Sequence, residues 1–247
     1  MLVAAIYDIH ANLPALEAVL EEIRQVGADH VVVGGDVLPG PMPRETLTYL
    51  LDLGIPVQFI YGNGEIAVLE QMAGKDPATV PEHYRPVIRW TAQQLRPEYE
   101  GLLARWPKTV TLGIPGIGEV LFCHATLRNE NEIFTRLTPE ERLLPILEAL
   151  NVSAVVCGHT HMQFDRMVGT VRVVNAGSVG ECRSENRALT GSYLGRTSNF
   201  TILATISRRL PSKFETQAIR KPTTLLPITS CNRPPRRKCL TYLPARN

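Results

Sequence analysis

The sequence predicts an α/β protein in which parallel strands alternate with helices. In the first half of the chain, short apolar runs alternate with segments whose apolar residues recur at helical spacing. Each apolar run ends in a polar, glycine-rich turn, which is where sites lie in sheets of this kind. From Lys108 onward, apolar and polar residues alternate, which predicts hairpin strands. The length of 247 residues allows one large domain or two small ones.

The first half contains three expected strands, at residues 2–7, 31–33 and 57–61. A helix is expected after each strand, and Asn12 is placed to cap the first of them. These helices run from residue 13 to Gly27, through residues 47–54 and over residues 65–73. Two further helices, at 81–95 and 97–106, are expected to form a helical insertion beside the sheet.

The second half is expected to return to strands. A hairpin is predicted from residues 109–112 and 119–123, followed by a helix over 138–150 and a buried strand at 152–157. Two more strands are expected at residues 163–168 and 171–174, and the second of them leads into the turn Asn175 to Gly180.

Composition indicates a globular cytoplasmic protein. Apolar residues make up 44% of the chain and charged residues 20%, and no apolar run approaches the roughly 18 residues of a membrane span. The N-terminal apolar run has no basic region before it and contains Asp8, so a signal peptide is not expected. The five cysteines show no paired spacing, which favours a reducing compartment.

Residues with metal-ligand side chains collect at the ends of the expected strands. His159 and His161 follow one strand two residues apart, so both imidazoles can point to the same side. Taken singly, such a histidine is more often an ordinary surface or core residue, and Asp8 or Asn63 could simply form a turn. The ordered set favours a site, and its members are Asp8, His10, Asp36, Asn63, His124, His159 and His161.

The chemistry of this set indicates a pair of divalent ions. Mixed oxygen and nitrogen donors without thiolate suit Mn²⁺, Fe, Zn²⁺ or Ni²⁺ better than Ca²⁺ or Mg²⁺ alone. Seven side chains are too many for one tetrahedral ion, but they suit two ions roughly 3.5–4 Å apart that share a carboxylate. Such a pair activates water and clamps the oxygens of a displacement at phosphorus.

Four short motifs carry a resemblance to a known family. Asp8-Ile9-His10, Gly35-Asp36, Gly62-Asn63 and Gly158-His159-Thr160-His161, with His124 before the last, resemble in this order the ligand blocks of the calcineurin-like metallophosphoesterase superfamily. The turn at residues 175–180 is similar to that of its small bacterial and archaeal phosphodiesterase branch. The resemblance covers residues 1–180, which we expect to form the metallophosphoesterase domain.

The resemblance implies a four-layer α/β/β/α sandwich with a dinuclear site, and a bridging hydroxide as nucleophile. Manganese is the first expectation for the metals, with Fe, Zn, Ni or Mg as alternatives. One ion would be held by Asp8, His10, Asp36 and His161; the other by Asp36 as the bridge, Asn63, His124 and His159. In this scheme Asp36, Asn63 and His124 are the catalytic residues. The chain departs from the family at Gly64, where many relatives carry a histidine that serves as general acid or phosphate ligand.

Residues 181–247 differ sharply from the rest of the chain. They carry 13 Lys and Arg against 3 Asp and Glu, whereas residues 1–180 carry 13 against 21. A disordered basic tail is one interpretation. We favour a single-base frameshift at about Gly180–Glu181, because the back-translated segment, read in another frame, can encode an acidic stretch with two strands and an amphipathic helix. On either interpretation, the C-terminal part of the expected fold is disrupted.

The expected function is metal-dependent hydrolysis of a phosphodiester or small phosphate ester. The alternative is a non-catalytic scaffold or interaction protein of the same fold, as in retromer-type coats, although the complete ligand set argues against it. Binding of nucleic acid would depend on the basic tail and is not the expected role, and no membrane partner is expected.

Overall fold

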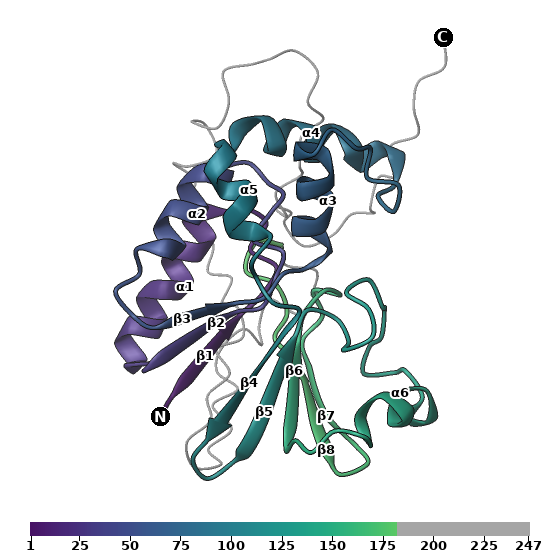
Figure 1. Cartoon of the computed structure of the whole chain (residues 1–247). Helices are drawn as coiled ribbons and strands as arrows, with labels where there is room; N and C mark the ends of the chain where they lie inside the picture. The colour runs from purple at the N-terminus through teal and green to yellow at the C-terminus, as the bar shows by residue number, and fades with distance from the viewer. Residues whose placement is uncertain (182–247) are drawn as a thin grey trace, which may run out of the picture. The chain divides into compact units, whose positions relative to one another are not determined.

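The computed structural model describes residues 1–181 as two β-sheets with helices on their outer faces (Figure 1). The first sheet has three parallel strands in the order β1-β2-β3. They are β1 (Val3–Ile6), β2 (His30–Val33) and β3 (Val57–Phe59). A helix follows each strand: α1 (Leu13–Val26), α2 (Pro43–Leu51) and α3 (Asn63–Met72). Asn12 caps α1 as expected, since its Oδ1 accepts the Ala15 N–H at 3.2 Å.

The second sheet has five strands in the order β4-β5-β6-β8-β7. They are β4 (Thr109–Ile114), β5 (Gly118–Cys123), β6 (Ala154–Cys157), β7 (Phe164–Val168) and β8 (Val171–Asn175). The predicted hairpins are the antiparallel pairs β4–β5 and β7–β8, and β6 lies parallel to both β5 and β8. The helix α6 (Glu140–Leu147) precedes β6.

The two sheets and the helices outside them form four layers, and a hydrophobic cluster lies between each pair of neighbouring layers. This arrangement confirms the predicted sandwich. In β2, Val31 and Val33 face the helices, whereas Val32 faces the second sheet, as the alternation of side chains along a strand requires. The cluster between the sheets joins Val32 to Phe122 of β5. On the other side of β5, Leu121 packs with Leu143 of α6.

The helices expected between residues 81 and 106 are also present. A short 3-10 helix (Glu82–Tyr84) leads into α4 (Arg85–Gln94), and α5 (Pro97–Leu103) follows. Ile88 of α4 and Leu103 of α5 belong to the same buried cluster as α1, α2 and the outer face of the first sheet. In the described part of the chain, no helix has the length and apolar character needed to cross a membrane.

Backbone hydrogen bonds hold the strand ends together, first within each sheet and then between the two sheets. Gly34 N–H donates to the Ile6 carbonyl at 2.8 Å, and Gly158 N–H donates to the His124 carbonyl at 2.8 Å. After β8 the chain returns to the end of β1, where Val179 N–H donates to the Tyr7 carbonyl at 2.9 Å. Turns from both sheets therefore converge on one place.

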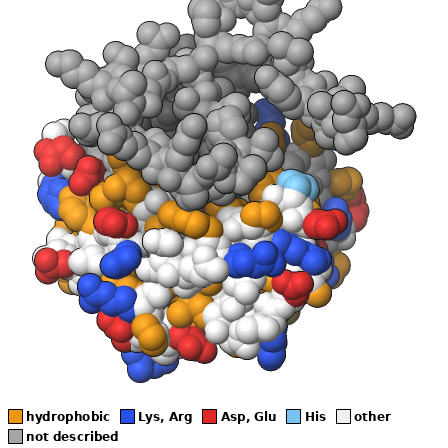
Figure 2. Space-filling view, turned by 90° about the horizontal axis from the view of Figure 1, so that it is seen from above, with side chains coloured by type: hydrophobic (Ala, Val, Ile, Leu, Met, Phe, Trp, Pro, Cys, Tyr) orange, Lys and Arg blue, Asp and Glu red, His pale blue; other side chains and the backbone are white. Residues whose placement is uncertain are grey.

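The predictions for residues 182–247, including the frameshift, the disordered tail and the disrupted C-terminal part, lie outside the described residues and stay predictions. The assignment of residues 1–180 and 81–106 as a domain and its insertion is likewise a prediction. On the face shown in Figure 2, the basic and acidic side chains of the described residues are interspersed.

Candidate metal centre

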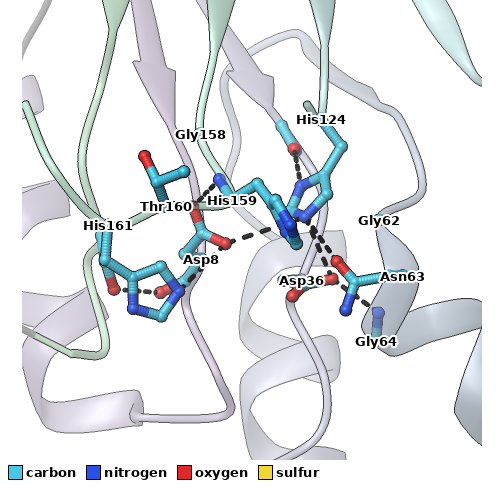
Figure 3. A network of polar contacts seen from close by, with 12 residues as sticks. Asp8, Asp36, Gly62, Asn63, Gly64, His124, Gly158, His159, Thr160 and His161 are labelled. Carbon is cyan, nitrogen blue, oxygen red and sulfur yellow. Dashed lines mark hydrogen bonds and ion pairs between the residues drawn. The ribbon is translucent and has the colours of Figure 1, made fainter. Parts of the chain in front are cut away.

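Asp8 lies at the middle of the converging turns and is fully buried (Figure 3). Its Oδ2 accepts the backbone N–H of His159 at 2.8 Å. Its Oδ1 faces three imidazoles, with the Nε2 atoms of His161, His124 and His10 at 3.3, 3.9 and 4.0 Å. This Oδ1 is buried and has no hydrogen-bond partner among the described residues. An unpartnered buried carboxylate oxygen is costly, and a bound cation would satisfy it.

His10 and His161 form a close pair beside Asp8. Their Nε2 atoms are 3.1 Å apart, and the ring planes are inclined by 54°. The Nδ1 of His161 lies 3.5 Å from a carboxylate oxygen of Glu181. Burial acts to lower the pKa of His161, but Asp8 and Glu181 raise it to about 9. Burial lowers the pKa of His10.

Asp36, Asn63 and His124 form the other side of the centre. The His124 Nδ1–H donates to the Gly34 carbonyl at 3.0 Å, which directs Nε2 into the site. That Nε2 lies 3.0 Å from Asn63 Oδ1 and 3.5 Å from Asp36 Oδ1. One ring nitrogen therefore faces two oxygen ligands of the kind that hard and borderline cations prefer.

His159 lies next to His124, and the two ring centroids are 5.2 Å apart. Burial lowers the pKa of His159 to about 4, and nearby His124 acts in the same direction. A neutral imidazole is the form that binds metal, so the environment of His159 favours ligation at neutral pH.

The two buried aspartates respond differently to the site. Burial acts to raise the pKa of Asp8, yet His161, His124 and His10 bring it below its ordinary value. Burial raises the pKa of Asp36 to about 6, against the opposing effect of His124. The proximity of Asp8 also raises the pKa of Asp36, so a cation between the two carboxylates would relieve their repulsion.

The backbone adopts the left-handed conformation at five of the seven candidate ligands. Among residues 1–181, every non-glycine residue with positive φ lies in or beside this site: Asp8, His10, Ala11, Asp36, His159 and His161, at φ between 48° and 67°. L-residues adopt this region at a cost, and such residues concentrate at functional sites. Asp and His are enriched among non-glycine residues in this region, whereas Ala11 is not a typical left-handed residue.

The predicted ligands fall into two compact groups. Asp8, His10 and His161 form one, and Asp8, Asp36 and His124 form the other, with ligand atoms inside each group within 4.8 Å of one another. Asn63 joins the second group through His124, whereas His159 belongs to neither group and adjoins His124 by ring contact. Asp8 is the carboxylate common to both groups, while the family resemblance gives the bridging role to Asp36.

Gly64, where many relatives carry a histidine, has no room for any side chain. A Cβ at this position would lie 2.1 Å from the Leu38 carbonyl oxygen and 2.9 Å from Asp36 Oδ1. The N–H of Gly64 donates to Asp36 Oδ1 at 2.7 Å. His83, a histidine outside the ligand set, is exposed and its ring packs on Tyr84.

Sequence reasoning missed three residues that hold the ligand turns. Glu65 is fully buried and accepts hydrogen bonds from the turn that carries Asp36; burial raises its pKa to about 7, with a contribution from Asp36. Asn175 Nδ2 donates to the Gly158 carbonyl at 2.6 Å, and Ser178 Oγ donates to the Asp8 carbonyl at 2.8 Å. Their only signal was position, in or next to a ligand motif.

Comparison with known families agrees with this geometry. A family model described as the calcineurin-like phosphoesterase superfamily domain matches residues 1–194. The chain belongs to this superfamily. Calcineurin-like phosphoesterases normally bind divalent metals, and Asp8, His10, Asp36, His124 and His161 are candidate ligands here.

Individual proteins that this chain resembles come from archaea and bacteria. It is 30% identical over 166 residues to the uncharacterized protein MJ0912 of Methanocaldococcus jannaschii, an alignment that spans 66% of this chain and 63% of that protein. The solved structure of hypothetical protein PH1004 from Pyrococcus horikoshii has a TM-score of 0.63 at 23% identity, covering 73% of this chain and 78% of its own. The solved structure of a metallophosphoesterase from Sphaerobacter thermophilus has a TM-score of 0.54 at 24% identity, and the match covers 75% of this chain and 79% of that one. These two structures support the fold.

The side chains of this site are themselves suited to binding divalent metal ions, independently of the family comparison. Asp8 Oδ1 has no hydrogen-bond partner among the described residues, and the Nε2 atoms of His10 and His161 lie 3.1 Å apart beside it, so these three atoms could share a proton or a bound cation. The donor set contains carboxylate and amide oxygens and imidazole nitrogens, and no described thiolate takes part.

Proposed function

We propose that this protein is a metal-dependent phosphoesterase that hydrolyses a phosphodiester or a small phosphate ester. The observation that carries the proposal is the pair of ligand groups sharing Asp8, because it offers two adjacent positions for divalent cations. When bound, two such ions supply an activated water as nucleophile and polarise the phosphoryl oxygens.

The side chains divide between the two proposed positions. His10 and His161 would hold one ion together with Asp8, and Asn63, His124 and His159 would hold the other, with Asp36 as the shared ligand that the family resemblance suggests. The Gly34 carbonyl fixes the tautomer and orientation of His124, as second-shell carbonyls commonly do for metal-bound histidine. Asn63, at the first position of α3, is held 3.0 Å from the same imidazole.

Metal reconstitution tests this proposal. Purified protein is stripped of metal and then supplied with Mn²⁺, Fe²⁺, Ni²⁺, Zn²⁺ or Mg²⁺, and hydrolysis of an aryl phosphodiester and of the matching monoester is measured. We expect hydrolysis to return when metal is added, with Mn²⁺ as the first choice, and the His159→Ala variant to show none. If folded protein hydrolyses neither substrate with any of the metals, the result would contradict the proposal and favour the non-catalytic alternative.

A further inference from the structure

Glu65 is a buried carboxylate that joins two ligand turns. It lies in the first turn of α3 and has no exposed surface. Its Oε2 accepts the N–H groups of Asp36 and Gly62, both at 2.8 Å. Its Oε1 accepts the N–H of Leu38 at 2.9 Å. Both oxygens are therefore engaged, and every one of these partners is a backbone N–H.

These contacts go beyond ordinary helix capping. A glutamate at the third helical position commonly accepts the N–H of the N-cap residue, which here is Gly62. The other two N–H groups come from the turn after β2, 29 and 27 residues earlier in the chain. Glu65 thus connects the turn that carries Asp36 with the turn that carries Asn63.

The turn that carries Asp36 and the turn that carries Asn63 pack closely against each other, so their relative position depends on the hydrogen bonds of Glu65. Gly64 N–H donates back to Asp36 Oδ1 at 2.7 Å. A Cβ on Gly62 would lie 2.3 Å from the same oxygen, and a Cβ on Gly35 would lie 2.7 Å from the Gly62 nitrogen. With no spare space between the turns, a shift of either one moves Asp36 relative to Asn63.

The arrangement is specific for a carboxylate with the length of glutamate. A carboxylate offers two acceptor oxygens, whereas the isosteric amide of glutamine offers one acceptor and one donor. A glutamine would therefore direct an N–H₂ group at a backbone N–H of one turn. Aspartate keeps the charge but is shorter by one methylene, so it cannot reach both turns from the same helical position.

We propose that Glu65 is a positioning residue that holds Asp36 and Asn63 in register for one of the two metal positions. The other position, formed by Asp8, His10 and His161, receives none of the contacts that Glu65 makes. Asn63 serves only one position, whereas Asp36 as the bridge serves both, so loss of Glu65 weakens the ion beside Asn63 more than the other. The inference rests on the proposed function, because it presupposes two bound ions.

Calorimetric titration of the metal-stripped full chain with Mn²⁺ tests the inference. We expect two ions for the wild type, and for Glu65→Gln one ion weakened about 10- to 100-fold and the other weakened clearly less. Electron paramagnetic resonance should show a spin-coupled Mn²⁺ pair in the wild type and an isolated ion in Glu65→Gln at the same metal concentration. His161→Ala should affect the opposite ion, and Glu45→Gln, an exposed glutamate on α2, serves as the matched control.

The outcomes separate the inference from the proposed function. Two ions at wild-type affinity in Glu65→Gln, or equal weakening of both, would overturn the role of Glu65 while leaving the dinuclear centre intact. Fewer than two ions in the wild type would overturn the dinuclear centre, and with it this inference. Circular dichroism checks that each variant is folded, and if Glu65→Gln is not, Glu65→Asp is expected to show the same selective loss.

Discussion

Gly158 is the position where one added methyl group should do most damage to this site. It lies between β6 and the two histidines, and a Cβ there would be 2.4 Å from Asp8 Oδ2 and 2.6 Å from Tyr7 Cδ1. Neither neighbour can withdraw, because Tyr7 and Asp8 are both buried and Asp8 Oδ2 also accepts the His159 N–H. Retreat of the Gly158 backbone is opposed by its hydrogen bonds to the His124 carbonyl and from Asn175.

We expect Gly158→Ala to destabilise the protein by about 3 kcal/mol, the upper end of the usual cost of overpacking a core. For a chain of this size, that corresponds to a fall in melting temperature of roughly 6–12 °C. Gly101→Ala is the matched control, because a Cβ on this residue of α5 meets no atom within 4 Å. Alanine is the better helix former by about 0.5–1 kcal/mol, so this variant should melt slightly above the wild type.

The assay is thermal unfolding followed by circular dichroism in EDTA, which removes any contribution of bound metal. Both glycines gain the same methyl group, so a difference between the variants reports the surroundings of each position. A Gly158→Ala protein that melts within 2 °C of the wild type would refute the reasoning, as would equal shifts in the two variants.

Three further predictions follow from other features. Mn²⁺ at about 100 times its dissociation constant should stabilise the protein by about 2.7 kcal/mol and EDTA should reverse this, whereas an unchanged melting curve would argue against a metal site. Asn175→Ala should cost about 1–3 kcal/mol in the same assay, because it leaves the Gly158 carbonyl and the Gly177 N–H without their buried partner; a neutral result would show that water replaces it. Sequencing of the coding DNA around Gly180 should reveal a single-base shift, and an intact frame together with the matching protein mass would reject the frameshift.

The candidate ligands could be found from the sequence because sites in parallel sheets lie beyond the carboxyl ends of the strands. Parallel strands carry their carboxyl ends to one edge, so Asp8 after β1, Asp36 after β2 and Asn63 after β3 had to lie near one another. The alternation of strands and helices predicted an α/β sheet, and it depends on periodicity and chain order, which a sequence displays directly. The four-layer sandwich was implied by the family resemblance.

Long-range contacts of loop side chains could not be predicted in this way. Glu65 looked like an ordinary residue of a first helical turn, and only the folded chain shows it bonded to Asp36 and Leu38. The closed space around Gly64 depends on the Leu38 carbonyl, which belongs to another turn. The sharing of Asp8 between two ligand groups depends on side-chain directions in left-handed turns, for which the sequence holds no simple rule.

The candidate ligands in the left-handed backbone conformation lower the stability of the protein while providing its metal site. Each non-glycine residue held in this region costs on the order of 1 kcal/mol or more, and glycine would relieve that cost at any of these positions. At His10 or His161 the relief would remove a ligand, whereas at Ala11, with φ of 48° and no ligand atom, it would remove a methyl group buried in the core, a loss of about 0.8 kcal/mol that offsets the relief. A library selected for heat resistance alone would therefore favour substitutions that erode the metal centre.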